Sequence, residues 1–452
     1  MDRGERAAIP EKVGIIDERR NTAARLERRT RRNSCYHGAI MKRRAFFQAC
    51  MGAAGAASLA DRADAAGLPK TKITRIRYFR TPTDAAGRPN TRQPLFNQST
   101  NVVLVETDSG LIGVGEGGSG DTMEQCAGLL IGEDPFRTDR LWQSMYRAYF
   151  YPAGREKAHA LGALDVALWD LKGKALGVPV YQLLGGKSRD HVECYSTGFP
   201  AKGTPKEVAR ACVEAGFQAY RISTDTQGPV MDRFANVNRV FELCKQVREG
   251  VGRDGGWCID FHTELDMPDA VALANMIEPL RPYFVEDLVR SENPGVYRTL
   301  RHQVKVPIAV GEQFGPKWDW NELIEQHLTD YARATIPNVG GITEFQKIAA
   351  MCETHYVGLV PHFTGPISEA AMVHCSTAFS GPVLMEMVMG GTRPWPYLNQ
   401  SYDLKNGKLW PNERPGLGVE VDTSKLQQIG DYKDAYSLTP MLRRPDGSYT
   451  NW

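Results

Sequence analysis

Short apolar runs that end in a charged residue recur through the middle of the chain. Three of them end at Asp260, Glu286 and Glu312, at one constant interval (286 − 260 = 26 and 312 − 286 = 26). A run of four or five apolar residues is typical of a buried strand, and about 26 residues accommodate one strand and one helix. The pattern therefore predicts repeated strand–helix units that build a parallel sheet.

The pattern continues towards the C-terminus. Further apolar runs end at His362 and Glu386, about two repeats and then one repeat further along (362 − 312 = 50 and 386 − 362 = 24). Residues 333–336 are expected to form the strand between Glu312 and His362. In a β/α barrel the strand ends meet at one rim, where barrel enzymes carry their chemistry. We therefore expect these charged side chains to converge.

A different pattern precedes the predicted barrel. Residues 73–79 and 102–107 predict strands, and residues 121–178 predict helices, the last of which Gly177 ends. The fold class is therefore α/β. The expected parts are an α+β capping domain over residues 70–190, a barrel over 191–400 with its first strands near Val192 and Ala219, and a turn-rich segment over 401–452 that packs back on the capping domain.

Composition narrows the function classes. The chain has 452 residues, of which 42% are hydrophobic and 24% charged, as in ordinary globular proteins. The net charge is +2, and no basic stripe runs through the body of the chain, so a nucleic-acid partner is not expected. The nine cysteines lack C-x-x-C pairs, so we expect free, buried cysteines and neither a zinc site nor a disulfide framework.

Residues 1–69 are not expected to belong to the fold. The first forty are polar and arginine-rich, and Met41-Lys42-Arg43-Arg44 then precedes a short alanine-rich apolar stretch. This arrangement resembles a Tat-type export signal with Met41 as the true start, although a chance arginine pair in a basic segment is the alternative. The stretch is too short to cross a membrane. We expect an exported, periplasmic protein without a membrane span, or otherwise a cytoplasmic one.

Three carboxylates at one rim suit a hard divalent cation. Mg²⁺ prefers oxygen ligands, and Mn²⁺ is a second candidate. A single acidic residue after a strand is more often a helix cap or a loop carboxylate. The repeated interval is what favours a metal site formed by Asp260, Glu286 and Glu312. The neighbouring Asp287 is either a partner of this site or a solvated carboxylate.

Several segments resemble a known family. The sequences ALDVALWDLKGK at 163–174 and GVPVYQLLGG at 177–186 resemble the enolase superfamily, mandelate racemase/muconate lactonizing enzyme subgroup. The sequences DFH at 260–262 and PHFTGP at 361–366 resemble its D-galactonate dehydratase branch. The resemblance covers roughly residues 70–452. It implies a modified (β/α)7β TIM-like barrel, an α+β capping domain, bound Mg²⁺ and a homo-oligomer.

The chemistry of that family requires a base and an acid. Removing the α-proton of a carboxylate substrate gives an enediolate, whose charge a bound cation stabilises. Histidine can act as base or acid near neutral pH. His362 is the candidate base, and His262, two residues after Asp260 on an extended chain, is the candidate acid. The resemblance suggests that Glu386 forms a hydrogen bond with the substrate carboxylate.

Two positions depart from the family pattern. Related racemases carry Lys-x-Lys on the second barrel strand, where this chain has Arg221-Ile222-Ser223. Arginine is a poor base, so we expect Arg221 and Ser223 to bind substrate, and one-face dehydration is favoured over racemisation. Related dehydratases support the base with an aspartate, where alignment gives Thr335. Either another carboxylate replaces it, or His362 is a weaker base.

Loops of the capping domain are the candidates for substrate recognition, although each residue could simply be solvated. They are Arg88, Arg92 and Gln93 in one loop, and Tyr151, Arg155 and His159 where a second loop enters a helix. Five other histidines are expected to be structural, namely His191, His302, His327, His355 and His374.

Together these features predict a lyase, specifically a carbon–oxygen hydro-lyase. We expect a Mg²⁺-dependent aldonate or aldarate dehydratase that forms a 2-keto-3-deoxy acid. The alternatives are an epimerase, racemase or cycloisomerase on the same scaffold, and a non-catalytic sugar-acid binding protein.

Overall fold

The computed structural model describes residues 67–82, 100–151, 154–224, 230–362, 365–391, 394–437 and 441–450. The predicted signal region up to residue 66 and the loop candidates Arg88, Arg92 and Gln93 lie outside these ranges. Within them, no helix is both long and apolar enough to cross a membrane. The seven cysteines of the described ranges are free and buried, as the sequence predicted.

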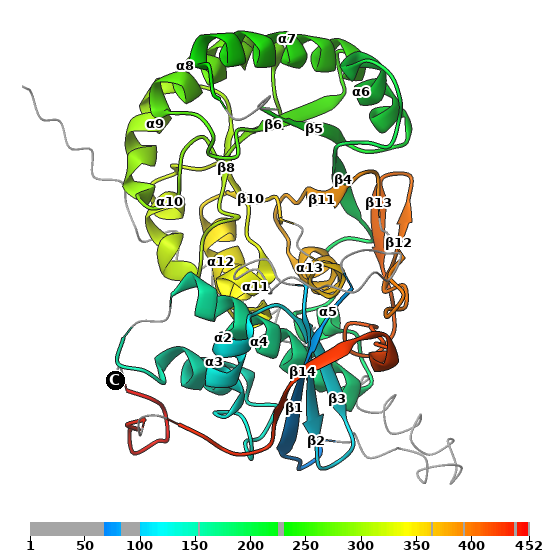
Figure 1. Ribbon diagram of the computed structural model, residues 1–452, viewed down its shortest axis with the longest axis vertical. Helices are drawn as coiled ribbons and strands as arrows, with labels where there is room; N and C mark the ends of the chain where they lie inside the picture. Colours follow the sequence, from blue (N-terminus) through cyan, green and yellow to red (C-terminus); the bar gives the residue numbers. More distant parts are fainter. Residues whose placement is uncertain are drawn as a thin grey trace, which may run out of the picture. The chain divides into compact units, whose positions relative to one another are not determined.

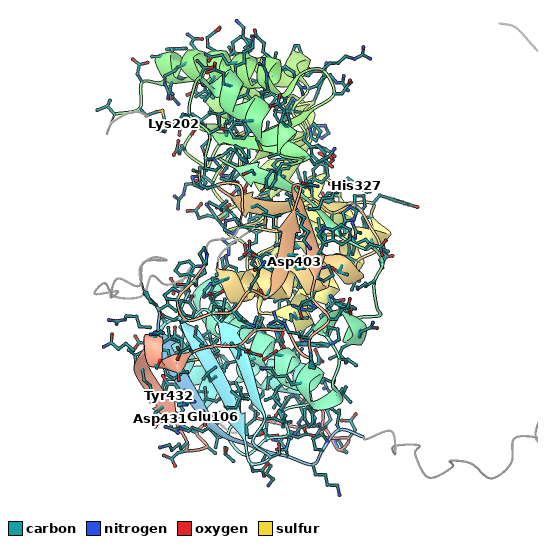
Figure 2. All side chains as sticks on the ribbon, turned by 90° about the vertical axis from the view of Figure 1, so that its right-hand side faces the viewer. Glu106, Lys202, His327, Asp403, Asp431 and Tyr432 are labelled. Carbon is teal, nitrogen blue, oxygen red and sulfur yellow. The ribbon has the colours of Figure 1, made fainter. Side chains whose placement is uncertain are left out.

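A small antiparallel sheet begins the described chain (Figure 1). Its strands are β1 (Ile73–Arg80), β2 (Val102–Thr107), β3 (Ile112–Glu116) and β14 (Gln427–Tyr432), in the order β14-β1-β2-β3. The last strand comes from the end of the chain, so that Asp431 and Tyr432 share this sheet with Glu106 (Figure 2). The predicted strands at 73–79 and 102–107 are therefore confirmed as β1 and β2, and β3 and the C-terminal β14 complete the sheet.

The sheet packs against a long helix of the same domain. The helices here are α2 (Gly120–Ala127), α3 (Thr138–Arg147), α4 (Arg155–Leu176) and the short α5 (Val180–Leu183). Glycines in β3 allow α4 to approach, because a Cβ on Gly115 would lie 1.9 Å from the Ala163 carbonyl oxygen. Gly177 ends α4 with φ of 68°, a conformation that glycine adopts without strain.

Parallel strands that alternate with helices follow (Figure 1). In the described ranges they are β4 (Val192–Thr197), β5 (Ala219–Ser223), β6 (Gly256–Asp260), β7 (Val285–Glu286), β8 (Ile308–Val310), β9 (Tyr331–Ala332), β10 (Gly358–Leu359) and β11 (Met385–Val388). Each strand from β4 to β10 pairs with the next one, and β11 pairs with β4. A parallel bridge between Leu359 and Val383 connects β10 to the segment that leads into β11. This is the predicted (β/α)7β arrangement.

The helices that connect these strands vary in length. They are α6 (Pro205–Glu214), α7 (Arg233–Val251), α8 (Met267–Ile277), α9 (Tyr297–Gln303), α10 (Asn321–Glu325), α11 (Ile336–Val339), α12 (Ile342–Thr354) and α13 (Pro366–Ala378). Short 3-10 turns are η1 (Glu278–Leu280), η2 (Pro294–Val296), η3 (Lys317–Asp319) and η4 (Thr423–Lys425). A hairpin of β12 (Tyr402–Lys405) and β13 (Lys408–Pro411) extends the sheet beyond β4.

Two predicted strand positions were wrong. Residues 333–336 do not form a strand, because β9 ends at Ala332 and α11 begins at Ile336. Pro337, in the first turn of α11, lacks an N–H and has a φ that suits a helix start. Glu386 was expected after its strand but lies within β11. The ladder nevertheless continues past β9, since Arg333 N donates to Val310 O at 3.0 Å.

An apolar layer inside the barrel explains how the charged residues are aimed. The buried cluster of Tyr195, Ala219, Cys258, Phe284, Ala309, Val360 and Leu384 comes from seven different strands or strand ends. Along a strand, residues two apart face the same side. Cys258, Phe284 and Leu384 therefore set the direction of the charged residues that follow two positions later, Asp260, Glu286 and Glu386.

Candidate active site

Carboxylates and guanidinium groups alternate at the end of the barrel strands. Arg221 Nη1 lies 2.7 Å from Glu386 Oε1, and Arg221 also forms an ion pair with Asp260. Arg333 Nη2 lies 2.9 Å from Glu386 Oε2 and 3.3 Å from Glu312 Oε2. All of these side chains are buried. The structure thus brings the predicted acidic residues together.

Negative charge outnumbers positive charge in this cluster. The five carboxyl groups of Asp260, Glu286, Asp287, Glu312 and Glu386 outnumber the two guanidinium groups described above by three (5 − 2 = 3). Both oxygens of Glu286 and Oδ2 of Asp287 are buried and accept no hydrogen bond from the described residues. Such oxygens are costly unless a cation or a donor faces them. Because Asp287 is buried, the solvated alternative for it was wrong.

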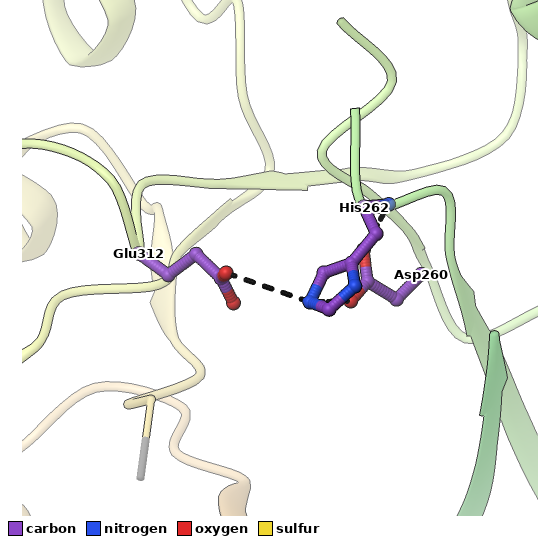
Figure 3. A group of neighbouring side chains, drawn as sticks. All are labelled: Asp260, His262 and Glu312. Carbon is purple, nitrogen blue, oxygen red and sulfur yellow. Dashed lines mark hydrogen bonds and ion pairs between the residues drawn. The ribbon is translucent and has the colours of Figure 1, made fainter. Parts of the chain in front are cut away.

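Potential ligand atoms gather in two overlapping groups. Asp260, His262 and Glu312 form one group (Figure 3), and Glu286, Asp287 and Glu312 form the other, with the ligand atoms of each group within 4.8 Å of one another. Glu312 belongs to both groups. Carboxylate oxygens on rigid strand ends are the donor set that Mg²⁺ prefers, so the residues present fit a divalent cation.

The carboxyl groups of the cluster differ in the direction of their pKa shifts. Burial raises the pKa of Glu286 and of Asp287 well above their ordinary values, and Arg221 and Arg333 offset this only in part for Glu286. Burial also opposes ionisation of Glu312, but His362 and Arg333 outweigh it and lower the pKa of Glu312 to about 2. Arg333 and Arg221 likewise outweigh burial and lower the pKa of Glu386. Glu312 and Glu386 are therefore ionised at neutral pH.

His362 lies beside the carboxylate cluster. Its Nδ1 is 3.0 Å from Thr335 Oγ1, and its Nε2 is 3.4 Å from Glu312 Oε2. Thr335 thus occupies the supporting position that the alignment assigned to it. Burial lowers the pKa of His362 despite the nearby Glu312 and Glu386. The imidazole is consequently neutral near pH 7, which a general base requires.

His262 faces the same carboxylates from another strand. Its Nε2 lies 3.4 Å from Asp260 Oδ2 and 3.8 Å from Glu312 Oε1 (Figure 3). The prediction of an extended chain here was wrong, because β6 ends at Asp260 and His262 has φ of 50°. A turn, rather than strand alternation, brings the ring to the cluster. The side chain is 52% exposed, so its ring can exchange protons with water.

The other residues predicted to contact substrate differ in their burial and in the groups that they contact. Ser223 ends β5 in register with Asp260. Arg221 is 5% exposed, and its donors face protein carboxylates and Thr197. Arg155 begins α4 and bonds to two barrel loops. Arg92 lies outside the described residues.

His159 was expected where a loop enters a helix, either solvated or in contact with substrate. It lies inside α4, near its start, and is fully buried. Its Nδ1 accepts a hydrogen bond of 2.7 Å from Gly118 N, so the solvated alternative for His159 was wrong. Tyr151, which precedes the same helix, is exposed.

Sequence reasoning missed Arg333. The assignment of residues 333–336 to a strand treated this residue as part of an apolar run, yet it is fully buried and contacts Glu286, Glu312 and Glu386. It also donates a hydrogen bond to Tyr195 Oη. The signal was available, since a long cation stands between Ala332 and Ala334 in an otherwise apolar run. A buried arginine needs carboxylate partners, and the acidic residues at the neighbouring strand ends offer them.

Comparison with known proteins places the chain in a family. Residues 82–185 match the family described as mandelate racemase/muconate lactonizing enzyme, N-terminal domain, and residues 204–425 match enolase C-terminal domain-like. A D-galactonate dehydratase of Pectobacterium atrosepticum is 34% identical over 370 residues, which are 77% of this chain and 95% of that protein.

Solved structures agree with the sequence match. A member of the enolase superfamily from Salmonella Typhimurium has a TM-score of 0.72 and 27% identity, over 80% of this chain and 100% of that one. An enolase from Pantoea ananatis with bound D-gluconate and Mg has a TM-score of 0.70 and 27% identity, over 78% of this chain and 94% of that one. The chain therefore belongs to the mandelate racemase/muconate lactonizing enzyme group of the enolase superfamily, and it is a lyase of the dehydratase type.

Proposed function

We propose that this enzyme dehydrates an acid sugar, an aldonate or aldarate, to a 2-keto-3-deoxy acid. The observation that carries the proposal is the placement of two histidines beside one carboxylate cluster. His362 Nε2 and His262 Nε2 lie 3.4 Å and 3.8 Å from the two oxygens of Glu312. A base and an acid that face a common centre are what removal of an α-proton and departure of a β-hydroxyl require. The similarity to D-galactonate dehydratases over 77% of the chain supports the same reaction class.

The cation site would be formed by Asp260, Glu286 and Glu312, with Mg²⁺ as the first candidate and Mn²⁺ as the second. When bound, the cation would stabilise the negative charge that develops on the substrate carboxylate as the α-proton leaves. The bound Mg in the Pantoea ananatis neighbour supports this choice.

His362 would take the α-proton. With its proton on Nδ1, the neutral ring donates to Thr335 Oγ1, at 3.0 Å, and leaves the Nε2 lone pair free. The α-carbon–hydrogen bond then breaks, and its electron pair becomes part of a carbon–carbon double bond. A hydroxyl cannot stabilise an imidazolium as an aspartate would, so Thr335 holds the ring in place without adding basicity.

His262 would complete the elimination. Its proton passes to the β-hydroxyl, the carbon–oxygen bond breaks, and water departs. The enol that remains becomes the 2-keto-3-deoxy acid by taking up a proton at the β-carbon and releasing the proton of its hydroxyl group. The exposed side chain of His262 would recover its proton from solvent.

Glu386 would accept hydrogen bonds from substrate hydroxyls. Arg221 and Arg333 lower the pKa of Glu386 and favour its ionised form, and the hydrogen bond with the substrate carboxylate that the resemblance suggests stays a prediction. The proposed substrate contacts remain Ser223 and Arg221 at the end of β5, together with Arg92. Export and assembly into a homo-oligomer remain predictions of the sequence.

The test uses the full chain with Mg²⁺ and pooled aldonic and aldaric acids in D₂O, followed by NMR. We expect a 2-keto-3-deoxy product that disappears in His362→Asn and in His262→Asn but persists in the control His355→Asn, whose ring bonds only to groups of its own helix end. Exchange at the α-carbon without loss of water would indicate an epimerase. Tight acid binding with neither product nor exchange would indicate a binding protein.

A further inference from the structure

Arg155, the first residue of α4, joins the capping domain to two barrel loops. Its Nε donates to Asp319 Oδ2 at 3.0 Å, its Nη1 to Ser291 Oγ at 2.7 Å, and its Nη2 to the Ser291 carbonyl oxygen at 3.3 Å. The guanidinium carbon lies 5.4 Å from the centre of the Phe314 ring. All three nitrogens of this arginine therefore donate to the barrel, which uses three of its five N–H groups.

The two loops that Arg155 holds follow two of the proposed cation ligands. Ser291 comes five residues after Glu286 (291 − 286 = 5), and Asp319 comes seven residues after Glu312 (319 − 312 = 7). Arg155 therefore ties both loops to one point on the capping domain. Because one guanidinium group donates to both loops, it fixes the distance between the loops and the distance of each loop from α4.

A continuous set of contacts leads from Asp319 back to Glu312. Asp319 Oδ2 also accepts from Gly315 N at 2.9 Å, and the next residue, Trp320, donates from its indole to the Gly315 carbonyl at 2.9 Å. The Trp320 ring fills the space beside Gly311, where an added Cβ would lie 2.0 Å from the ring. Gly311 directly precedes Glu312. A shift of Asp319 would therefore move Trp320 and, through Gly311, the Glu312 backbone.

The same turn, η3, has a second attachment to the capping domain. Trp318 stacks on Tyr146 of α3, and Tyr146 stacks on Trp142, both with ring centres 4.9 Å apart. On the barrel side, Lys317 Nζ lies 2.8 Å from Glu344 Oε1 of α12. The turn is thus held between domains, and Arg155 supplies its polar attachment.

We propose that Arg155 is a positioning residue that sets the divalent-cation affinity of the barrel by holding the loops after Glu286 and Glu312. The proposal rests on the cation site of the proposed function and assigns to Arg155 a role other than substrate binding. Residues that orient cation ligands from outside typically change metal affinity about 10- to 100-fold when they are removed. Arg155 acts through intervening residues, so we expect the lower end of that range.

The experiment titrates Mg²⁺ and Mn²⁺ into metal-free full-length protein without substrate, by calorimetry. The variants are Arg155→Met, Arg155→Lys, Asp319→Asn and the double variant Arg155→Met/Asp319→Asn. The matched control is Arg75–Asp431, an ion pair within the small sheet whose side chains are 35% and 31% exposed, against 36% and 31% for Arg155 and Asp319. Thermal unfolding of every variant separates a lost fold from a lost cation site.

We expect Arg155→Met to weaken cation binding about tenfold, and Asp319→Asn to weaken it to a similar degree. The double variant should lose no more than the stronger single one, because both remove one clamp. Arg155→Lys should recover only part of the affinity, since an ammonium lacks the fork. Arg75→Met and Asp431→Asn should leave it unchanged.

Unchanged cation affinity in all Arg155 and Asp319 variants, beside a wild type that binds, would overturn the proposal alone. A higher KM for the acid sugar with unaltered cation affinity would return Arg155 to substrate binding and also overturn it. If the wild type bound neither cation, the proposed function would fail together with this inference.

Discussion

Two regions of the molecule bury carboxylates, and different groups face the carboxylates in each region. At the barrel rim, guanidinium and imidazole groups face the acids, and the pKa of Glu312 falls to about 2. At the contact between α4 and the barrel helices, backbone amides face them instead. Asp165 Oδ2 accepts from Thr343 N at 2.9 Å and Oδ1 from Thr343 Oγ1 at 2.6 Å, and burial raises the pKa of Asp165 to about 7.

The difference separates a site from a structural contact. Asp165 and Asp170 on α4 have both oxygens bonded, and Asp170 accepts from Val114 N and Leu417 N while Lys174 lies at 2.6 Å. Glu116 caps α13 through one oxygen, which accepts from Ile367 N and Ser368 N. The rim instead keeps Glu286 without hydrogen bonds and holds more carboxylates than guanidiniums. Burial is common to both regions, and Glu116 Oε1 is also buried without a hydrogen bond, so the excess of carboxyl over guanidinium groups is what distinguishes the rim.

The strongest test of this contrast is Glu312→Gln. Glu312 belongs to both groups of ligand atoms, so its loss should weaken cation binding at least 100-fold and lower turnover more than about 1,000-fold. Calorimetry and the product assay would measure the two effects. Wild type stripped with EDTA should lose activity and regain it with Mg²⁺, whereas the variant should not. Normal cation binding in Glu312→Gln would break the contrast.

At the domain contact, Asp165→Ala should affect stability and not the cation. It leaves Thr343 N and the start of α12, which has no side-chain cap of its own, without their acceptor. We expect a loss of about 2 kcal/mol in the free energy of unfolding. Urea unfolding measures it, and Asp165→Asn, which keeps an acceptor, should lose much less. A changed cation affinity in the folded Asp165→Ala protein would contradict the division of roles.

The buried histidines outside the rim should make the stability of the fold depend on pH. Burial lowers the pKa of His159 to about 3 and that of His374 to about 4, both below the unfolded value of 6.5. The folded state therefore binds fewer protons than the unfolded state between these values. Stability is full above about pH 6.5 and falls as the pH drops towards 4, by roughly 1.4 kcal/mol per unit for each group.

The variant that isolates this effect is His159→Asn, whose side-chain oxygen can still accept from Gly118 N. In urea titrations from pH 7 to pH 4.5, the free energy of unfolding of this variant should fall less steeply than that of the wild type. The difference in slope should correspond to about one fewer proton bound on unfolding. A slope equal to that of the wild type would mean that His159 is not buried in its neutral form.

The smallest effect is expected at Thr335. Thr335→Val keeps the shape of the side chain but removes the oxygen that faces His362 Nδ1. The ring then loses one orienting hydrogen bond, so kcat should fall about threefold to tenfold while cation affinity stays constant. Thr335→Ser is the matched control. An unaltered kcat in Thr335→Val would show that the packing around the ring is sufficient to orient it.

Local pattern was enough to predict the barrel and the convergence of its acids. Strand alternation and the 26-residue interval depend only on neighbouring residues and on the topology of strand–helix repeats. Asp260, Glu286 and Glu312 could therefore be assigned to one rim from the sequence. His362 and Thr335 followed from motif spacing, and the structure places them 3.0 Å apart. The ends of strands were predicted less accurately, as at residues 333–336, because a strand of two residues is too short to show an alternation of apolar and polar positions.

Only the tertiary structure decided which residues far apart in the chain meet. In the sequence, Arg333 interrupts an apolar run; in the structure, Glu286, Glu312 and Glu386 surround it. Arg155 resembles a solvated loop residue in the sequence, and the structure shows that it bonds to Ser291 and Asp319. The sequence by itself determined the family, the fold and the acidic rim, since these are written in short-range periodicity and motifs. Charge balance at the rim depends on contacts between residues 21 to 165 positions apart, and the attachment of its loops on contacts 136 and 164 positions apart, which no local pattern encodes.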